Sequence, residues 1–172
     1  FLADGALSAQ QVADVVVVAV VNAQQVETVL YGEGGAVATL RKAGLVMQCA
    51  TVPPAFARSL GERLAKSGHE LLDAPMSGGR ARAESGELTF MASGAPQAFA
   101  TAESILSATS AKVFRLGDAA GIGSLVKTVN QLNWTSTAKP IRHSGTRKSC
   151  AWRTLTWPDG MGRPAVRATL AS

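Results

Sequence analysis

The chain has 172 residues, of which 47% are hydrophobic and 17% are charged, and this composition excludes a wholly disordered or coiled-coil protein. Two cysteines are too few for a disulfide scaffold, and the longest apolar run is far shorter than the roughly 20 residues that cross a membrane. A net charge of +5 is typical of a nucleic-acid binder, but here the charge is not spread over the chain. Residues 1–132 carry −1 and residues 133–172 carry +6, so the basic charge belongs to the last forty residues.

Predicted strands and helices alternate along residues 14–132. The continuous β-branched run at 14–21 is typical of a strand covered on both faces, since a half-exposed strand would alternate. Further strands are predicted at 45–50, 69–74, 88–93 and 112–116, and helices at about 26–30, 54–64, 96–106 and 124–132. This order predicts an α/β fold, with a mostly parallel sheet and helices on both faces. Ligands of such sheets bind beyond the carboxyl ends of the strands.

The segment 73–79, Asp-Ala-Pro-Met-Ser-Gly-Gly, follows the third predicted strand. Ser77 offers a hydroxyl, while Gly78 and Gly79 allow backbone N–H groups to approach an anion closely. An ordinary tight turn explains the same residues equally well. The segment is therefore a candidate anion site with a structural alternative.

A glycine-rich turn at 117–124 leads into the last predicted helix. Its spacing is neither that of a Walker loop nor Gly-x-Gly-x-x-Gly. Lys127 and Asn130 follow, three residues apart, so they share one helix face. A lysine that meets a carbonyl oxygen in a crevice can act as a general acid. Taken alone, however, a single helical lysine is more often simply solvated.

Polar residues also follow the first two strands. Asn22 and Gln25 come after the first strand, and Thr51 comes after the second. They could contact a cofactor at the carboxyl edge of the sheet, or they could only cap helices. From these residues alone, capping is the favoured interpretation.

Together these segments indicate a protein family much more specifically than any one of them does alone. Residues 12–132 resemble the β-hydroxyacid dehydrogenase family, which includes 3-hydroxyisobutyrate dehydrogenase and tartronate semialdehyde reductase, and look closest to its threonate-dehydrogenase-like branch. The segments that carry the resemblance are 13–17, 21–26, 51–53, 73–79, 86–94 and 121–132. The resemblance implies a partial Rossmann-type, doubly wound domain that binds NAD or NADP. It also implies an oxidoreductase that moves hydride between nicotinamide and a small β-hydroxy acid such as threonate, 3-hydroxyisobutyrate or glycerate.

The resemblance assigns a role to several residues. Lys127 matches the family's catalytic lysine, whose ammonium bonds the substrate oxygen and relays its proton. Asn130 matches a residue that holds the substrate beside it. The positions that match the substrate-carboxylate loop are Ser77, Gly78 and Gly79. Those that match the lining of the nicotinamide half of the cofactor are Val20, Val21, Gln25 and Thr51.

Parts of the family pattern are missing at both ends. Phe1 comes after the family's first strand, its Gly-x-Gly-x-x-Gly turn and the residue that selects NAD or NADP, so we expect a bare strand edge. Beyond residue 132 the family continues into a helical domain that closes the active site and forms a homo-oligomer. Here residues 133–172 form a basic tail, interpreted as low in order and translated in the wrong reading frame. We therefore expect a partial NAD(P)-binding domain at 1–132 that is inactive by itself.

The remaining expectations concern partners and location. We expect a small-molecule hydroxy acid as substrate, no metal, no membrane, and a cytoplasmic protein, with nucleic acid an unlikely partner. The alternative is a binding module or pseudoenzyme whose basic tail, with Trp134, Trp152 and Trp157, binds nucleic acid through phosphate charge and base stacking.

Overall fold

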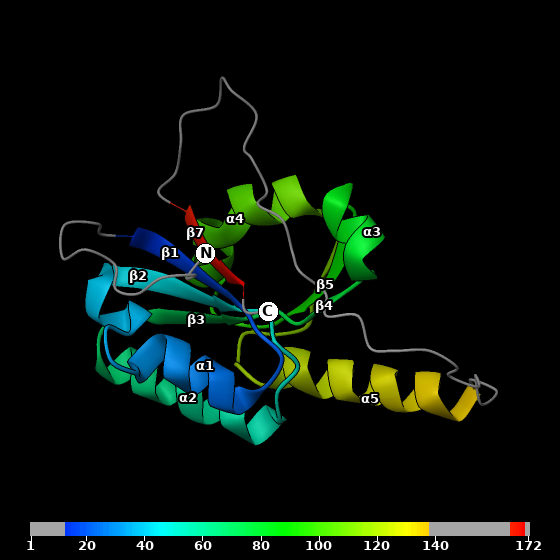
Figure 1. Cartoon of the computed structure of the whole chain (residues 1–172), viewed down its shortest axis with the longest axis horizontal. Helices are drawn as coiled ribbons and strands as arrows, with labels where there is room; N and C mark the ends of the chain where they lie inside the picture. Colours follow the sequence, from blue (N-terminus) through cyan, green and yellow to red (C-terminus); the bar gives the residue numbers. More distant parts are fainter. Residues whose placement is uncertain (1–12, 138–165, 171–172) are drawn as a thin grey trace.

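The computed structural model describes residues 13–137 and 166–170. Its helices are α1 (Ala23–Tyr31), α2 (Pro54–Lys66), α3 (Gly79–Glu84), α4 (Pro96–Thr109) and α5 (Ile122–Thr137), with a 3₁₀ helix at Ala36–Thr39. Its strands are β1 (Ala13–Ala19), β2 (Leu40–Gln48), β3 (Glu70–Asp73), β4 (Met76–Ser77), β5 (Leu88–Ala92), β6 (Ser110–Arg115) and β7 (Val166–Leu170). The alternation of strands and helices predicted from the sequence is confirmed (Figure 1).

The strands form two sheets. The first has the order β3-β2-β1-β7, with every neighbouring pair parallel. The second has the order β4-β5-β6, with β4 antiparallel and β6 parallel to β5. An antiparallel bridge between Asp73 and Ser93 connects the end of β3 to the segment after β5. The mostly parallel architecture is thus confirmed, but the strands form two sheets that are connected at Asp73.

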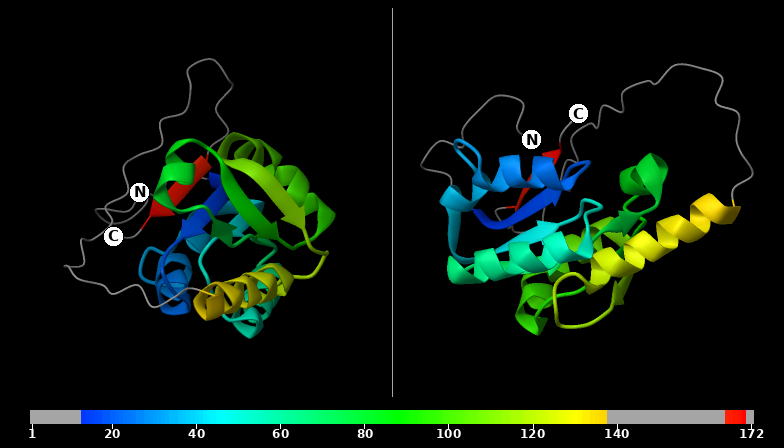
Figure 2. Two further views of the ribbon diagram at one scale, coloured as in Figure 1. Left: turned by 90° about the vertical axis from the view of Figure 1, so that its right-hand side faces the viewer. Right: turned by 90° about the horizontal axis from the view of Figure 1, so that it is seen from below.

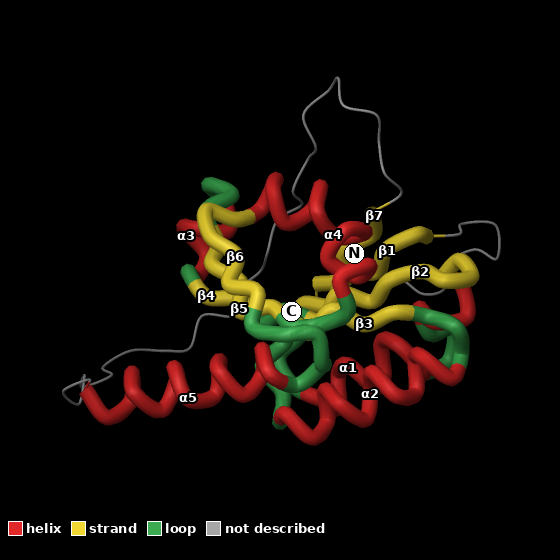
Figure 3. Tube along the Cα trace, turned by 180° about the vertical axis from the view of Figure 1, so that it is seen from behind, coloured by secondary structure: helices red, strands yellow, loops and turns green. Residues whose placement is uncertain are grey.

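Helices cover both faces of the first sheet, as the β-branched run predicts. Val16 and Val18 of β1 belong to a buried cluster that includes residues of α1 and α2, whereas Val15 belongs to a second cluster that includes residues of α4. Side chains alternate between the faces of a strand, so both faces of β1 must be apolar. Figure 3 shows α1, α2 and α5 on one side of the strands and α4 on the other.

Local signals account for the starts of α1, α2 and α4. Asn22 caps α1 by accepting a hydrogen bond from the backbone N–H of Gln25. Pro54 and Pro96 begin α2 and α4, where the missing N–H of proline costs nothing. The structure adds the short elements β4 and α3, which are too brief to show a hydrophobic period. It also begins β2 at Leu40 rather than at residue 45, through an exposed stretch that contains Arg41 and Lys42.

The expectation of a bare edge on β1 is wrong. Residues 166–170 form β7, which pairs in parallel with β1 from Val15↔Val166 to Ala19↔Leu170 (Figures 1 and 2). Residues 166–170 of the tail thus pair with the body, and the interpretation of the tail as low in order stays a prediction. Helix α5 also continues to Thr137, five residues past the expected boundary at 132. The interpretation of residues 138–165, and of the tryptophan side chains, lies outside the described residues.

Among the described helices, none is both long and apolar enough to cross a membrane.

Candidate active site

Lys127 lies in the second turn of α5 and is buried, with 8% of its surface exposed. Its Nζ donates a hydrogen bond to the hydroxyl of Ser77, at 3.3 Å. Burial lowers the pKa of Lys127 below its ordinary value, because the charged ammonium is more costly to desolvate than the neutral amine. The solvated-lysine interpretation is therefore wrong. A buried amine with a lowered pKa beside a hydroxyl is suited to proton transfer.

Ser77 ends the two-residue strand β4, and its side chain is half-buried. Gly78 and Gly79 follow with φ of 137° and 66°, in the region where residues with a Cβ are strained. The chain turns there and begins α3. The chain thus turns tightly at the two glycines, next to the contact of Ser77 with Lys127, and the anion site stays a prediction. Both glycines are exposed.

Asn130 lies on α5 one turn beyond Lys127, and its side chain is exposed. The spacing of three residues places both on one helix face, as predicted. The structure brings Lys127 and Ser77 into contact, and it leaves Asn130 at the exposed end of the same face.

The four predicted cofactor residues lie just beyond the carboxyl ends of β1 and β2. Val20 is buried, Val21 is 71% exposed, and Thr51 is half-buried. Gln25 accepts a hydrogen bond from the backbone N–H of Val21, at 2.8 Å, as Asn22 does from that of Gln25. The amide oxygen of Gln25 thus closes the first turn of α1, and the apolar Val21 side chain is exposed beside it.

The sequence patterns did not predict a buried polar cluster of Asp73, Ser93 and Ser124. This cluster joins the end of β3, the segment after β5 and the start of α5. Asp73 and Ser93 are fully buried and Ser124 is 1% exposed. Asp73 accepts hydrogen bonds from the backbone N–H groups of Gly121 (3.0 Å) and Ser124 (2.9 Å) and from the Ser124 hydroxyl (2.7 Å). The Ser93 oxygen accepts from the N–H of Gly123, at 2.9 Å. The available signal was an aspartate in an apolar strand, because such residues are seldom fully buried without partners.

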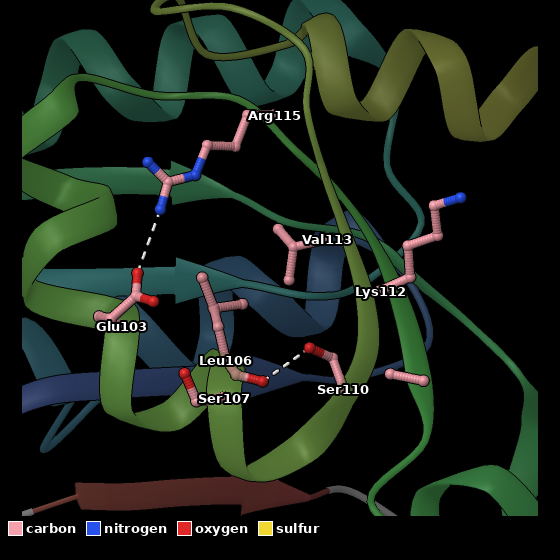
Figure 4. A pocket seen from close by; sticks show the side chains of 8 residues that line it. Glu103, Leu106, Ser107, Ser110, Lys112, Val113 and Arg115 are labelled. Atoms are coloured by element: carbon pink, nitrogen blue, oxygen red, sulfur yellow. Dashed lines mark hydrogen bonds and ion pairs between the residues drawn. The ribbon is translucent and has the colours of Figure 1, made fainter.

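Two surface hollows in the described part of the chain lie away from these residues. One lies between α4 and β6, beside the ion pair of Arg115 with Glu103 at 3.1 Å (Figure 4). The other is lined by residues of α2, of β3 with the preceding His69, and of the segment before α5, which contains Asp118. Neither contains a predicted site residue, and the arrangement of Lys127 and Ser77 identifies the candidate site better than a surface hollow does. Within the described ranges, no group of three or more His, Cys, Asp or Glu residues could hold a metal ion.

The mostly parallel sheet with helices on both faces defines a domain of the Rossmann type. A family model described as the NAD binding domain of 6-phosphogluconate dehydrogenase matches residues 2–117, and the chain belongs to this family. The expectation of NAD or NADP as the cofactor agrees with this family.

Relatives of known name confirm the resemblance to the β-hydroxyacid dehydrogenases. The chain is 56% identical to the L-threonate dehydrogenase of Cupriavidus necator over 119 residues, which are 69% of this chain and 40% of that protein. It is 35% identical to the 3-hydroxyisobutyrate dehydrogenase of Pseudomonas aeruginosa over 130 residues, 76% of this chain and 43% of that protein. A crystal structure of 3-hydroxyisobutyrate dehydrogenase from Salmonella typhimurium superposes with a TM-score of 0.66 and 37% identity, over 70% of this chain and 41% of that one. The chain thus spans about 40% of the length of these relatives.

Proposed function

We propose that this chain carries the catalytic lysine and part of the NAD(P) site of an oxidoreductase that acts on a small β-hydroxy acid. The observation that carries the proposal is the buried Lys127, which bonds Ser77 on the segment that follows β3. Relatives named as L-threonate and 3-hydroxyisobutyrate dehydrogenases support the substrate class.

In this mechanism Lys127 binds the oxygen of the reacting carbon. When the acid is oxidised, the neutral amine accepts the hydroxyl proton, and in the reverse direction the ammonium returns it. The lowered pKa increases the fraction of amine available near neutral pH. Ser77 holds Nζ in place and, with the N–H groups of Gly78 and Gly79, offers donors to the substrate carboxylate. Asn130 contacts the substrate from the next turn of α5.

The residues near the cofactor fit a nicotinamide. The exposed Val21 side chain is an apolar surface that a flat ring could cover, and Gln25 secures the backbone beneath it. Val20 and Thr51 complete the edge formed by β1 and β2. The bound nicotinamide would supply or accept the hydride, and the role of the protein is to position the acid against it.

Ligand titrations of the 172-residue chain followed by amide NMR test this function. We expect NAD⁺ or NADP⁺ to shift the signals of Val21, Gln25 and Thr51, and L-threonate or 3-hydroxyisobutyrate then to shift those of Ser77, Gly78 and Gly79. The Lys127→Met variant removes the amine and should lose the response to the acid. The matched control, Lys66→Met, changes an exposed lysine of α2 and should keep it. If neither ligand shifts these residues, the proposal is wrong.

Turnover tests a separate expectation, that the chain is inactive by itself. NADH formation with the same acids should be absent or very slow, and turnover that disappears in Lys127→Met would overturn this expectation. The expected cytoplasmic location and the homo-oligomer of the family stay predictions. So does the alternative of a nucleic-acid-binding tail, because residues 138–165 lie outside the described part of the chain.

A further inference from the structure

A buried carboxylate holds the beginning of the helix that carries Lys127. Asp73 Oδ2 accepts the N–H groups of Gly121 and Ser124, and Oδ1 accepts the hydroxyl of Ser124. Every one of these partners is a donor, so the two oxygens of an ionised carboxylate satisfy them all. The negative charge also lies at the positive end of the helix dipole. Asp73 therefore anchors α5 at its first turn, from a different segment of the chain.

The residue that Asp73 holds, Ser124, lies one helical turn from Lys127. Ser124 and Lys127 are three residues apart on α5, so they lie on neighbouring turns of the same face. Ser77, which accepts the hydrogen bond from Lys127, is four residues after Asp73. The segment 73–77 thus contacts the helix twice, once at its start through Asp73 and once at the amine through Ser77. A shift of the helix start would move Nζ relative to Ser77.

Close packing restricts the same turn. The Ser93 hydroxyl oxygen accepts the N–H of Gly123, and a methyl group added at Gly123 would lie 2.7 Å from the backbone oxygen of Asp73. Burial is the cause of the lowered pKa of Lys127, and Asp73 accepts hydrogen bonds from the start of the helix that carries this lysine. The influence of Asp73 on the amine therefore passes through the position of α5.

We propose that Asp73 is the positioning residue for Lys127, holding the first turn of α5 so that the amine stays buried beside Ser77. The importance of this role for catalysis rests on the proposed function, but the geometric claim does not. A residue that only satisfied a buried helix end would change the stability of the fold without a specific effect on the amine.

The test follows the titration of Lys127 by NMR of the whole chain, through the ε-carbon signals of ¹³C-labelled lysine. The Lys127 signal is assigned by its absence in Lys127→Arg. Three variants change the anchor to different degrees. Asp73→Ala removes all of its acceptors, Ser124→Ala removes one hydroxyl donor, and Asp73→Asn removes the charge but keeps an oxygen for the two N–H groups. The matched control is Gln48→Met, because Gln48 is fully buried on β2 at the position paired with Asp73.

We expect Asp73→Ala to raise the apparent pKa of Lys127 toward the ordinary lysine value, because the amine becomes hydrated. Ser124→Ala should raise it less, and Asp73→Asn should restore it. Gln48→Met should leave it unchanged even where it lowers the midpoint of urea unfolding as much as the anchor variants do. If Asp73→Ala does not fold, Ser124→Ala decides the question in the same way.

Two results would overturn the inference. One is a Lys127 titration that is the same in wild type, Ser124→Ala and Asp73→Ala. The other is an equal shift in Gln48→Met, which would show a general effect of destabilisation. Because the titration needs no substrate or cofactor, these results are separate from a failure of the proposed function, which would appear as an absence of ligand-induced shifts in wild type.

Discussion

Asp73 is fully buried and accepts hydrogen bonds from Gly121 and Ser124, and this environment leads to a prediction about stability. Burial raises the pKa of Asp73 above the ordinary value of 3.8, while hydrogen bonds from Ser124, Gly121 and Ser93 oppose this rise. The folded state therefore holds the proton more tightly than the unfolded state. The stability that comes from this difference is complete below pH 3.8 and is lost as the pH rises through the folded pKa.

The Asp73→Asn variant has no such titration. We expect its free energy of unfolding, relative to wild type, to improve steadily as the pH rises from about 3.8 through the folded pKa of Asp73. Urea unfolding of both proteins at several pH values from 3.5 to 7 measures the difference. A difference that stays constant with pH, or that moves in favour of wild type, would contradict the raised pKa.

Cys49 is a second buried ionisable residue. It directly follows β2 and is buried, as free cysteines often are. Burial raises the pKa of its thiol to about 12, with a smaller contribution from the charge of Asp73. The thiolate is the reactive form of cysteine, so Cys49 is unreactive in the folded protein near neutral pH.

At the scale of elements, helix α5 exposes apolar residues and buries polar ones. Its exposed residues include Leu125, Val126, Val129 and Leu132, whereas its buried residues include the polar Ser124 and Lys127. Hydrophobic periodicity alone would turn such a helix the other way. The hydrogen bonds that Asp73 accepts from Ser124, and the absence of a side chain at Gly123, explain the observed orientation.

Gly123→Ala tests the close contact of α5 with the sheet. The added methyl group would overlap the backbone oxygen of Met91 and approach that of Asp73 to 2.7 Å. Neither oxygen can move without disturbing a strand or a bridge, so we expect a loss of about 1–3 kcal/mol in the free energy of unfolding. Urea denaturation measures it.

Gly61→Ala on α2 is the matched comparison. There the nearest neighbours of an added methyl group are side-chain carbons of Ala120 and Leu71, at 3.3 and 3.4 Å. Alanine is also the better helix former, so we expect little change or a small gain. An equal loss in both variants would show that close contact with the sheet is not what requires Gly123.

Asn22 tests the start of α1. Its side chain accepts the N–H of Gln25 at 2.9 Å, so Asn22→Ala should lower the free energy of unfolding by ~1 kcal/mol. The control is Gln24→Ala, an exposed change in the same turn. A cost for Gln24→Ala equal to that for Asn22→Ala would argue against a capping role.

At the scale of the whole molecule, β7 completes the first sheet. It covers the edge of β1 with a parallel ladder over five residues from a segment about 150 positions away in the sequence. An uncovered edge strand offers unpaired N–H and C=O groups to other chains.

Truncation after residue 165 would uncover this edge. We expect the truncated chain to associate more strongly than the full chain, which light scattering coupled to size-exclusion chromatography measures at several concentrations. Truncation after residue 170 leaves β7 intact and should behave like the full chain. Equal behaviour of both truncated chains would show that β7 does not protect the edge.

Local patterns predicted most of the elements, and they placed Lys127 and Asn130 on one helix face. The β-branched run of β1 and the prolines at the starts of α2 and α4 act within a few residues, so they are visible in the sequence. The spacing of Lys127 and Asn130 on one helix face has the same origin. The family resemblance assigned the lysine its role, because the separate segments occur in a specific order.

Only the tertiary structure decided how the site is assembled. The contact of Lys127 with Ser77 spans 50 residues, and the bonds of Ser124 with Asp73 span 51. Such contacts form because chain turns and packing bring distant segments together, and no local period records them. The sequence alone therefore determined most of the elements and which residue types can do chemistry. The burial of Lys127, the anchoring by Asp73 and the covering of β1 by β7 depend on long-range packing, which balances desolvation against hydrogen bonds that only the folded chain can make.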